Sequence, residues 1–423
     1  MLCAEMSPER QMQKKQKKSA DSVLGAEFSK GSNQRGVKQY NEKLVIDVVR
    51  RLDAVSKAEI TRITGLSAQT ITVIANRLID EQLLLKDNVV RGKVGQPSVP
   101  LRLNPDGAIS LGIKLGRRTS QVIAISFTYD VLEIESLHYD YPDSSSILDW
   151  LKRAVTTVIG KLTSVQRARI VGIGLAMPAH LHSWEGIIDA PEGVLSEWQH
   201  IDVMSWLASE FGLPVHKIND ASAACLAEMS LHHRTHQLNC IYYYVGTFFG
   251  GGIALGGHIF EGNSGQAASV ASLPLSLPKD GKSPCQMVSA AGLHTLEAEA
   301  IARGFDRNIF LSEQPLQDVH LALFDSWAEE AACALAFAVI GGQCYLDAPV
   351  SIIDGRLPEM LMSRLVEKVE TAFEKFDLRG IALPQLQQGR LGMNARPLGA
   401  AIVPLHHYFS LSTFQLQIKT ENN

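Results

Sequence analysis

The stretch YVGTFFGGGIALGG, residues 244–257, is the most glycine-rich segment of this 423-residue chain, and it lies between two apolar runs. Those runs predict two strands joined by a tight hairpin. Glycines let a backbone approach a ligand closely and aim its amide groups at an anion, so the loop could hold a phosphate. No lysine follows the glycines and no Gly-x-Gly-x-x-Gly opens a helix here, so a plain hairpin is the alternative.

Length and composition bound the class of protein. A chain of this length predicts two or three domains. No run of about 18 apolar residues occurs and no apolar segment opens the chain, so we expect a cytoplasmic protein with no membrane partner. The six cysteines are scattered without a Cys-x-x-Cys pair, which favours reduced thiols.

Charge is distributed unevenly along the chain. Residues 1–105 carry 18 Lys and Arg against 11 Asp and Glu, whereas the remainder carries 22 against 33. A basic end on an acidic body favours a nucleic-acid-binding head. A basic tail is the alternative, because the lysine run at residues 14–18 supplies part of the excess. We expect residues 1–38 to form a disordered basic arm.

Three short helices are predicted after the arm, within a head that spans residues 39–105. Residues 41–52 have apolar side chains at helical spacing. Ser56 and Glu59 form a capping box for a second helix that ends at Gly65, and Ser67 caps the third. Two short helices joined by a tight turn predict a helix-turn-helix, whose second helix enters the major groove of DNA.

The third helix has a polar face that could read bases, since Gln and Asn side chains suit adenine. Two predicted strands around the basic segment 91–96 favour a winged helix-turn-helix over a plain helical bundle with a solvated face. The partner is then operator DNA. The predicted DNA-binding residues are Ser67, Gln69, Thr70, Thr72, Asn76 and Arg77 on the helix, and Arg91, Lys93 and Gln96 in the wing.

After residue 105 the pattern becomes α/β. Strand-rich blocks begin near residues 108 and 240, and each is followed by helical segments. Strands followed by crossover helices, twice over, predict two stacked α/β lobes with a cleft between them. The longer predicted helices cover residues 146–162, 288–303, 319–345 and 358–376.

Several motifs resemble the ROK family of repressors and sugar kinases in order and spacing. They are GIGLAMPA at 172–179, VHKINDASAACLAE at 215–228, VGTFFGGGIALGGHIFEGNSG at 245–265 and RPLGAA at 396–401. Residues 56–84 and 95–107 are similar to the winged head of the repressor branch. The resemblance implies an actin-like, two-lobed ATPase-type body of the ribonuclease H-like class over residues 106–423. It also implies a homodimer or homotetramer.

The resemblance further implies that phosphoryl transfer is lost. Family kinases open their first strand pair with Asp-x-Gly-Gly-Thr, and the matching positions here are Lys114, Gly116, Arg117 and Arg118. The carboxylate is therefore lost, and bulky cations fill the turn. Phe248 replaces a glycine of the second phosphate loop and is expected to pack between the lobes. Asp220 matches the catalytic base, which family repressors keep for hydrogen bonds to sugar. We therefore expect no enzyme activity and no cofactor, and an ATP-dependent sugar kinase with a fused DNA-binding head is the alternative.

The sugar and zinc positions differ too. Where sugar-binding members carry Glu-x-Gly-His, the aligned residues are Ser269, Ala271 and Ser272. Cys285 remains from the three zinc thiolates, while Met287 and Gly292 occupy the other positions, so we expect no metal. The candidate ligand contacts in the cleft are Asn219, Asp220, Ser269, Ser272 and His294.

Together these patterns predict a DNA-binding transcriptional regulator, a repressor of carbohydrate-metabolism genes. A sugar-like effector in the cleft would change the lobe angle and with it the spacing of paired heads on operator half-sites. A DNA-binding protein without any small ligand is a further alternative.

Overall fold

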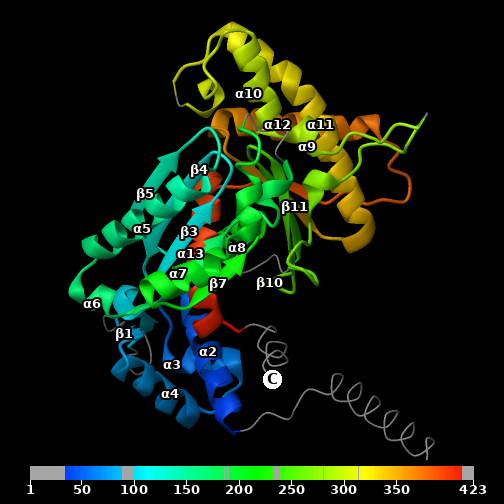
Figure 1. Ribbon diagram of the computed structural model, residues 1–423. Coiled ribbons are helices and arrows are strands. Elements are labelled where there is room, and N and C mark those ends of the chain that lie inside the picture. Colours follow the sequence, from blue (N-terminus) through cyan, green and yellow to red (C-terminus); the bar gives the residue numbers. More distant parts are fainter. Residues whose placement is uncertain are drawn as a thin grey trace, which may run out of the picture.

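A small head lies at one end of a larger body, and the body has two lobes, each built on a five-stranded sheet (Figure 1). This arrangement confirms the predicted two-lobed α/β fold class. The computed structural model describes residues 34–87, 99–184, 187, 190–232, 239–279, 281–312 and 314–411.

In its described residues, 34–87 and 99–105, the head has three helices and a two-stranded antiparallel sheet. The predicted capping box is present, because Ser56 accepts from the Glu59 amide while the Glu59 carboxylate accepts from Ser56. Gly65 ends that helix in the left-handed conformation that glycine favours. The elements are α2 (Gln34–Leu52), α3 (Lys57–Thr64), α4 (Ala68–Asp80), β1 (Leu84–Lys86) and β2 (Leu101–Leu103).

The first helix begins earlier than the sequence predicted. It starts at Gln34 rather than near residue 41, and Val37 in the additional turns borders the groove next to α4. Residues 1–33, which contain most of the predicted arm, lie outside the described residues. The two strands of the predicted wing are present, but its tip, with Arg91, Lys93 and Gln96, also lies outside them.

The first lobe has the strand order β5-β4-β3-β6-β7. Its first three strands pair antiparallel, and β3, β6 and β7 pair in parallel. The elements of this lobe are β3 (Ile109–Leu115), β4 (Thr119–Ile125), β5 (Val131–His138), α5 (Ser144–Lys161), α6 (Ser164–Arg167), β6 (Ile170–Ala176), α7 (Val203–Phe211) and β7 (Val215–Ile218).

The second lobe repeats the same topology with the order β10-β9-β8-β11-β12. The glycine-rich stretch forms the predicted hairpin between β8 and β9. The elements of this lobe are β8 (Cys240–Val245), β9 (Phe249–Leu255), β10 (His258–Ile259), α9 (Val288–Ala291), α10 (Leu293–Ala302), α11 (Asp318–Leu346), β11 (Val350–Gly355), α12 (Glu359–Ala372) and β12 (Gln385–Gln388).

The prediction of a single helix over residues 288–303 is wrong. The structure divides it at Gly292, whose backbone is extended. The amide groups of Leu293 and His294 donate to Gly246 O at 2.9 Å and Thr247 O at 3.1 Å. Because these amides bind the hairpin turn, they cannot continue the hydrogen-bond ladder of α9.

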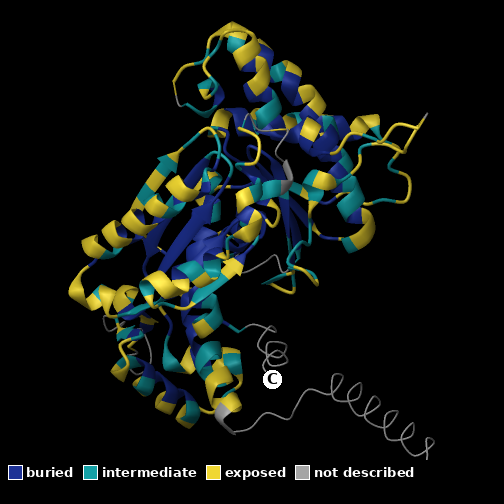
Figure 2. Cartoon of the chain, in the orientation of Figure 1, coloured by how far each residue is buried: buried dark blue, intermediate teal, exposed yellow. Residues whose placement is uncertain are grey.

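Two helices cross between the lobes, α8 (Asp220–Leu231) and α13 (Ala395–Phe409). Their backbones touch, since a Cβ added at Gly399 would lie 1.7 Å from Ala223 O. On its other side α13 approaches β6, where a Cβ at Gly174 would lie 1.7 Å from Ala400 O. Figure 2 shows the sheets and the helices between them as the buried centre of the molecule.

The end of α13 also joins the head to the body. One apolar core includes Val45 and Val49 of α2, Phe127 of the first lobe and Ile402 and Leu405 of α13. The head therefore packs into the same core as the first lobe. Among the helices of the described residues, none is long and apolar enough to cross a bilayer.

The crossing of α8 and α13 gives a stability prediction. We expect Gly399→Ala to lower the free energy of unfolding by about 3 kcal/mol or more, because its methyl group would overlap a backbone carbonyl that cannot move freely. Urea unfolding followed by circular dichroism measures this change.

Gly160→Ala is the matched control for this substitution. Gly160 lies in α5 and has nothing within 4 Å of the position of an added Cβ. We expect the control to raise stability by roughly 0.5–1 kcal/mol through helix propensity. Equal effects of the two substitutions would contradict the proposed close crossing.

Candidate functional site

The exposed face of α4 is the first candidate site. Gln69, Thr72, Val73 and Asn76 are exposed, and Val73 keeps 64% of its surface. Ser67 caps the helix by accepting from the Thr70 amide at 3.1 Å. This orientation leaves the first turns of α4 open to a groove of DNA.

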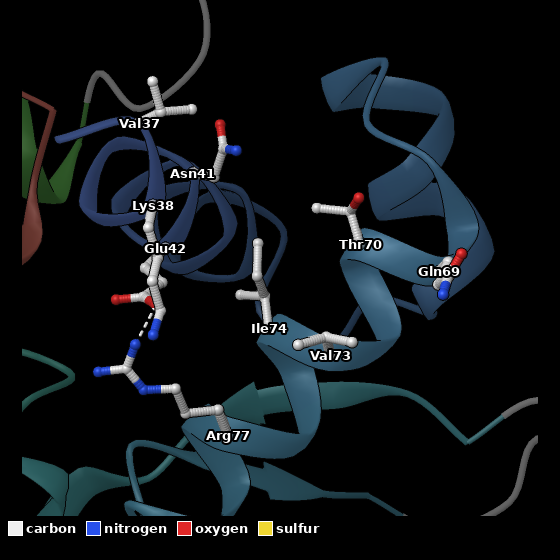
Figure 3. Close-up of a pocket in the computed structure, with 9 residues that line it drawn as sticks. All are labelled: Val37, Lys38, Asn41, Glu42, Gln69, Thr70, Val73, Ile74 and Arg77. Atoms are coloured by element: carbon white, nitrogen blue, oxygen red, sulfur yellow. Dashed lines mark hydrogen bonds and ion pairs between the residues drawn. The ribbon is translucent and has the colours of Figure 1, made fainter. Parts of the chain in front are cut away.

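Two predicted DNA-binding residues of α4 bind other parts of the head. Arg77 forms an ion pair with Glu42 of α2, as Figure 3 shows, and its Nε lies 2.8 Å from Glu81 Oε1. Asn76 Oδ1 accepts from Lys57 Nζ at 2.9 Å. Arg77 therefore braces α4 against α2, whereas Asn76 keeps its amide donors toward solvent.

A groove of about 460 Å³ separates α4 from the start of α2 (Figure 3). Its floor is apolar where Ile74 and Val73 face Val37, and it is polar toward Gln69 and Thr70. The groove therefore continues the exposed face of α4 and adds apolar surface to it.

The cleft between the lobes is the second candidate site. Its volume is about 130 Å³. Four of the five predicted ligand contacts, Asn219, Asp220, Ser269 and Ser272, line it together. The remaining lining residues are Arg117, Pro178, Ala179, His180, Ala221, Phe248, Phe249, Gly250, Gly251, Gln266, Ala267, Ala268, Val270 and Ala271.

The start of α8 forms one wall of this cleft. Asn219 is the N-cap, and its Oδ1 accepts from the amides of Ala221 at 3.0 Å and Ser222 at 3.4 Å. Asp220 accepts from Arg396 of α13 at 3.0 Å. The Asp220 carboxylate is therefore engaged in an ion pair with Arg396 in this arrangement of the lobes.

Contrary to the prediction, His294 is not among the residues that line the cleft. Its Nδ1 lies 3.1 Å from Thr247 O, and its ring packs edge-on against Phe248, with the centroids 5.1 Å apart. Burial lowers the pKa of His294 below the ordinary histidine value. His294 therefore packs against Phe248, which lines the cleft, without lining the cleft itself.

Phe248 packs between the lobes, as the sequence predicted. The Arg117 guanidinium of the first lobe lies over its ring, 4.1 Å from the centroid. The phenyl ring and the guanidinium together occupy the space between the two hairpin turns. A backbone cradle for phosphate is therefore closed by side chains at this point.

Further contacts across the cleft involve residues that the sequence did not single out as site residues. His180 Nε2 lies 3.1 Å from Gln266 Oε1, and Arg118 Nε lies 3.5 Å from Glu297 Oε2. Gln266 falls within a motif quoted from the sequence, but its partner comes from the other lobe. Such long-range pairs carry no local sequence signal.

Basic residues gather behind the cleft. Lys114 is fully buried and donates to Thr119 O at 2.7 Å. Burial, reinforced by Arg396 and Arg356, lowers the pKa of Lys114 well below its ordinary value, and burial lowers the pKa of Arg117 to about 10. Burial is the main cause of both shifts, and the nearby Arg396 guanidinium adds to each.

Metal-ligand groupings are not found in the described part of the chain. No cluster there contains three or more His, Cys, Asp or Glu side chains placed to hold an ion. Cys285 is exposed, while Met287 is buried in the core of the second lobe.

Cationic side chains of α2 add to the apolar core that joins head and body. The Arg50 guanidinium of α2 lies 4.7 Å from the Phe127 ring centroid and 4.2 Å from that of Tyr129. Lys43 Nζ donates to His407 O of α13 at 2.9 Å. The last turn of α13 therefore touches the helix that precedes the helix-turn-helix.

Comparison with protein families identifies the body. The sequence profile of the ROK family matches residues 110–402. The uncharacterized protein y4fQ of Sinorhizobium fredii is 24% identical over 87% of this chain and 91% of its own length. The xylose repressor of Bacillus spizizenii is 24% identical over 55% of this chain, and the match spans 60% of the repressor.

Solved structures share the fold. A ROK family transcriptional regulator, a homologue of the Escherichia coli MLC protein, matches with a TM-score of 0.63 and 18% identity over 88% of this chain and 98% of its own. A ROK glucokinase of Streptomyces griseus, in complex with glucose and AMPPNP, matches with a TM-score of 0.55 and 18% identity over 70% of this chain and 99% of its own.

The head contact predicts a loss of stability in acid. Burial, with Arg50, His258 and Lys43 nearby, lowers the pKa of His406 from 6.5 to about 3. Below pH 6.5 the unfolded chain binds a proton that the folded chain does not bind until about pH 3. Stability is therefore full above pH 6.5 and falls with decreasing pH, by about 1.4 kcal/mol for this residue at pH 5.5.

Thermal unfolding at pH 7.5 and 5.5 measures this effect. We expect His406→Gln to reduce the drop in melting temperature between the two pH values, whereas His200→Gln, at an exposed position, leaves it unchanged. An identical drop in His406→Gln and the wild type would rule out this role of His406.

Proposed function

Because this chain belongs to the ROK family, we propose that it is a sequence-specific DNA-binding transcriptional regulator, a repressor of carbohydrate-metabolism genes. The observation that carries the proposal is that α13 connects the head to the interlobe cleft. The exposed face of α4 belongs to a head that shares one apolar core with α13, and α13 begins at the interlobe cleft. The cytoplasm, where its operator DNA resides, is the location we propose.

DNA contact is assigned to the start of α4 and to the wing. Gln69, Thr72 and Asn76 are exposed and would reach base edges, while Ser67 and Thr70 would lie near the phosphates at the helix start. Asn76 Oδ1 already accepts a hydrogen bond from Lys57, so we expect only the Asn76 amide NH2 group to donate to a base. A donor alone suits the acceptor oxygens of guanine or thymine better than adenine, whose two-bond contact also needs the Asn oxygen.

The remaining predicted DNA contacts have different supporting roles. Arg91, Lys93 and Gln96 are proposed to contact phosphates or the minor groove from the wing. Arg77 contributes by holding α4 against Glu42 of α2. Its effect on DNA binding would be indirect.

A sugar-like effector is proposed to bind in the cleft. Asn219, Asp220, Ser269 and Ser272 offer hydrogen bonds of the kind that hydroxyl groups accept and donate, and His294 would act through Phe248. The present volume of about 130 Å³ is below the roughly 300 Å³ of typical ligand pockets. Binding would therefore require the lobes to open.

Helix α13 would transmit that opening to the head. Its first turn holds Asp220 through Arg396, and its last turn holds Lys43 of α2 through His407 O. A ligand that competes for Asp220 would move one end of a rigid helix whose other end contacts the head. In a homodimer or homotetramer, the spacing of the paired heads would then change.

We infer that the body does not transfer phosphate. Phe248 and Arg117 fill the space between the two turns, and Asp220 is paired with Arg396. A general base needs a free position next to the hydroxyl whose proton it takes. The sugar kinase remains the alternative function, because Asp220 still lines the cleft.

Substitutions on α4 test DNA recognition. We expect Gln69→Ala and Asn76→Ala each to weaken operator binding roughly tenfold or more, since one base contact contributes about 1–3 kcal/mol. A mobility-shift assay on an operator defined by footprinting measures this loss. Thr157→Ala, at an exposed position of α5, is the control and should bind normally. Unchanged affinity in both α4 variants would refute the assigned face.

A coupled kinase assay separates regulator from enzyme. With ATP and a panel of hexoses, amino sugars and polyols, we expect the wild type and Asp220→Asn to turn over at the same background rate. Wild-type turnover that falls about 100-fold or more in Asp220→Asn would instead establish the kinase.

A further inference from the structure

Five basic side chains converge where the lobes meet, and we call them the interlobe cation cluster. They come from strand β3, the turn after it, the segment after β11, and the start of α13. The cluster consists of Lys114, Arg117, Arg118, Arg356 and Arg396.

Acidic partners neutralise only part of this cluster. Arg118 pairs with Glu297, and Arg396 pairs with Asp220. Within the residues that the structure describes, Lys114, Arg117 and Arg356 have no ion pair. Lys114 and Arg356 bind neutral oxygens, Thr119 O at 2.7 Å and Thr247 Oγ1 at 3.1 Å. Even without Lys114, whose pKa is lowered by burial, four arginines face only the two paired carboxylates of Glu297 and Asp220, so the cluster carries an excess of positive charge.

An excess of buried cations destabilises the closed lobes. Each charge loses hydration on burial, and like charges repel more strongly where water is excluded. The lowered pKa of Lys114 and that of Arg356 both reflect burial and repulsion by Arg396. A bound anion would offset this cost.

Arg117 is the member of the cluster that reaches the cleft. It lines the cavity, and its Nε is buried without a hydrogen-bond partner among the described residues. Its face lies on Phe248, which leaves the in-plane N–H groups as donors for an anion. The N-terminal end of α8 lies in the same wall and adds the positive end of a helix dipole.

The rest of the cleft suits hydroxyl groups. Asn219, Gln266, Ser269 and Ser272 line it beside Arg117. Amide and hydroxyl side chains both donate and accept, as the hydroxyl groups of a sugar require. The lining therefore combines the Arg117 cation and the Asp220 carboxylate, which is paired with Arg396, with uncharged polar side chains.

We propose that the effector is an anionic carbohydrate whose phosphate ester or carboxylate group binds Arg117 while its hydroxyl groups meet the uncharged polar side chains of the cleft. This inference rests on the regulator function proposed above and names its ligand class. A neutral sugar would leave the excess charge of the cluster uncompensated. The anion would also help to hold the lobes together once they close around it.

Isothermal titration of the full-length protein in low salt tests the ligand class. The probes are glucose 6-phosphate, glucuronate, glucose, xylose and inorganic phosphate. We expect at least one of the two anionic sugars to bind tenfold or more tighter than glucose and xylose. If glucose or xylose binds as tightly as the anionic sugars, the proposal is overturned. Inorganic phosphate binding as tightly as glucose 6-phosphate would overturn the carbohydrate part.

Substitution of Arg117 tests the site. We expect Arg117→Gln to lose tenfold or more in affinity for the anionic sugar, and Arg153→Gln, at an exposed position of α5, to lose none. Arg117→Lys keeps the charge and should retain more affinity than Arg117→Gln. This second variant keeps the test informative if Arg117→Gln folds poorly. Unchanged binding in Arg117→Gln would exclude this residue as the anion contact.

Operator binding is measured separately, so the two proposals can fail independently. If the operator is bound but no anionic sugar binds, only the ligand class is wrong. If an anionic sugar binds through Arg117 but no variant or condition gives specific DNA binding, the anion site stands and the regulator function is wrong.

Discussion

The backbone contact between α8 and α13 is the constraint on which the other parts of the molecule depend. Gly399 allows α13 to touch Ala223 of α8, and Gly174 allows it to lie directly on β6. With no side chain between them, these elements have little freedom to slide separately. The cleft wall at Asp220 and the head contact at His407 are thus attached to one rigid unit, and their relative positions follow from the packing of α13.

The same crossing determines what the cleft can do chemically. Arg396 comes from the first turn of α13 and meets Asp220 at the first turn of α8, so the carboxylate is already neutralised when the lobes are closed. Phe248 and Arg117 then close the space between the hairpins. Under the function proposed above, this arrangement would serve recognition, because binding needs complementary polar groups whereas phosphoryl transfer needs a placed donor and a free base.

The sequence predicted local features better than distant contacts. The caps at Ser56 and Ser67, the left-handed Gly65 and the hairpin after residue 244 depend on neighbouring residues, and the structure has them. The break at Gly292 depends on carbonyl groups of a turn far away in the sequence. The contacts of His294 with Phe248 and of Arg77 with Glu42 likewise depend on how the chain packs. The periodicity of the sequence does not predict such partners.

The shared core of head and body has a consequence for how this protein can vary. Phe127 of the body packs against Phe409 of α13 with ring centroids 4.8 Å apart, and the Arg50 guanidinium of the head lies over the same ring. A head exchanged for another would leave these aromatic surfaces open to water. Under the proposed contact between α4 and the operator, new specificity would be more accessible through changes on the outer face of α4 than through grafting of a whole head, because α4's outer residues change without disturbing the junction.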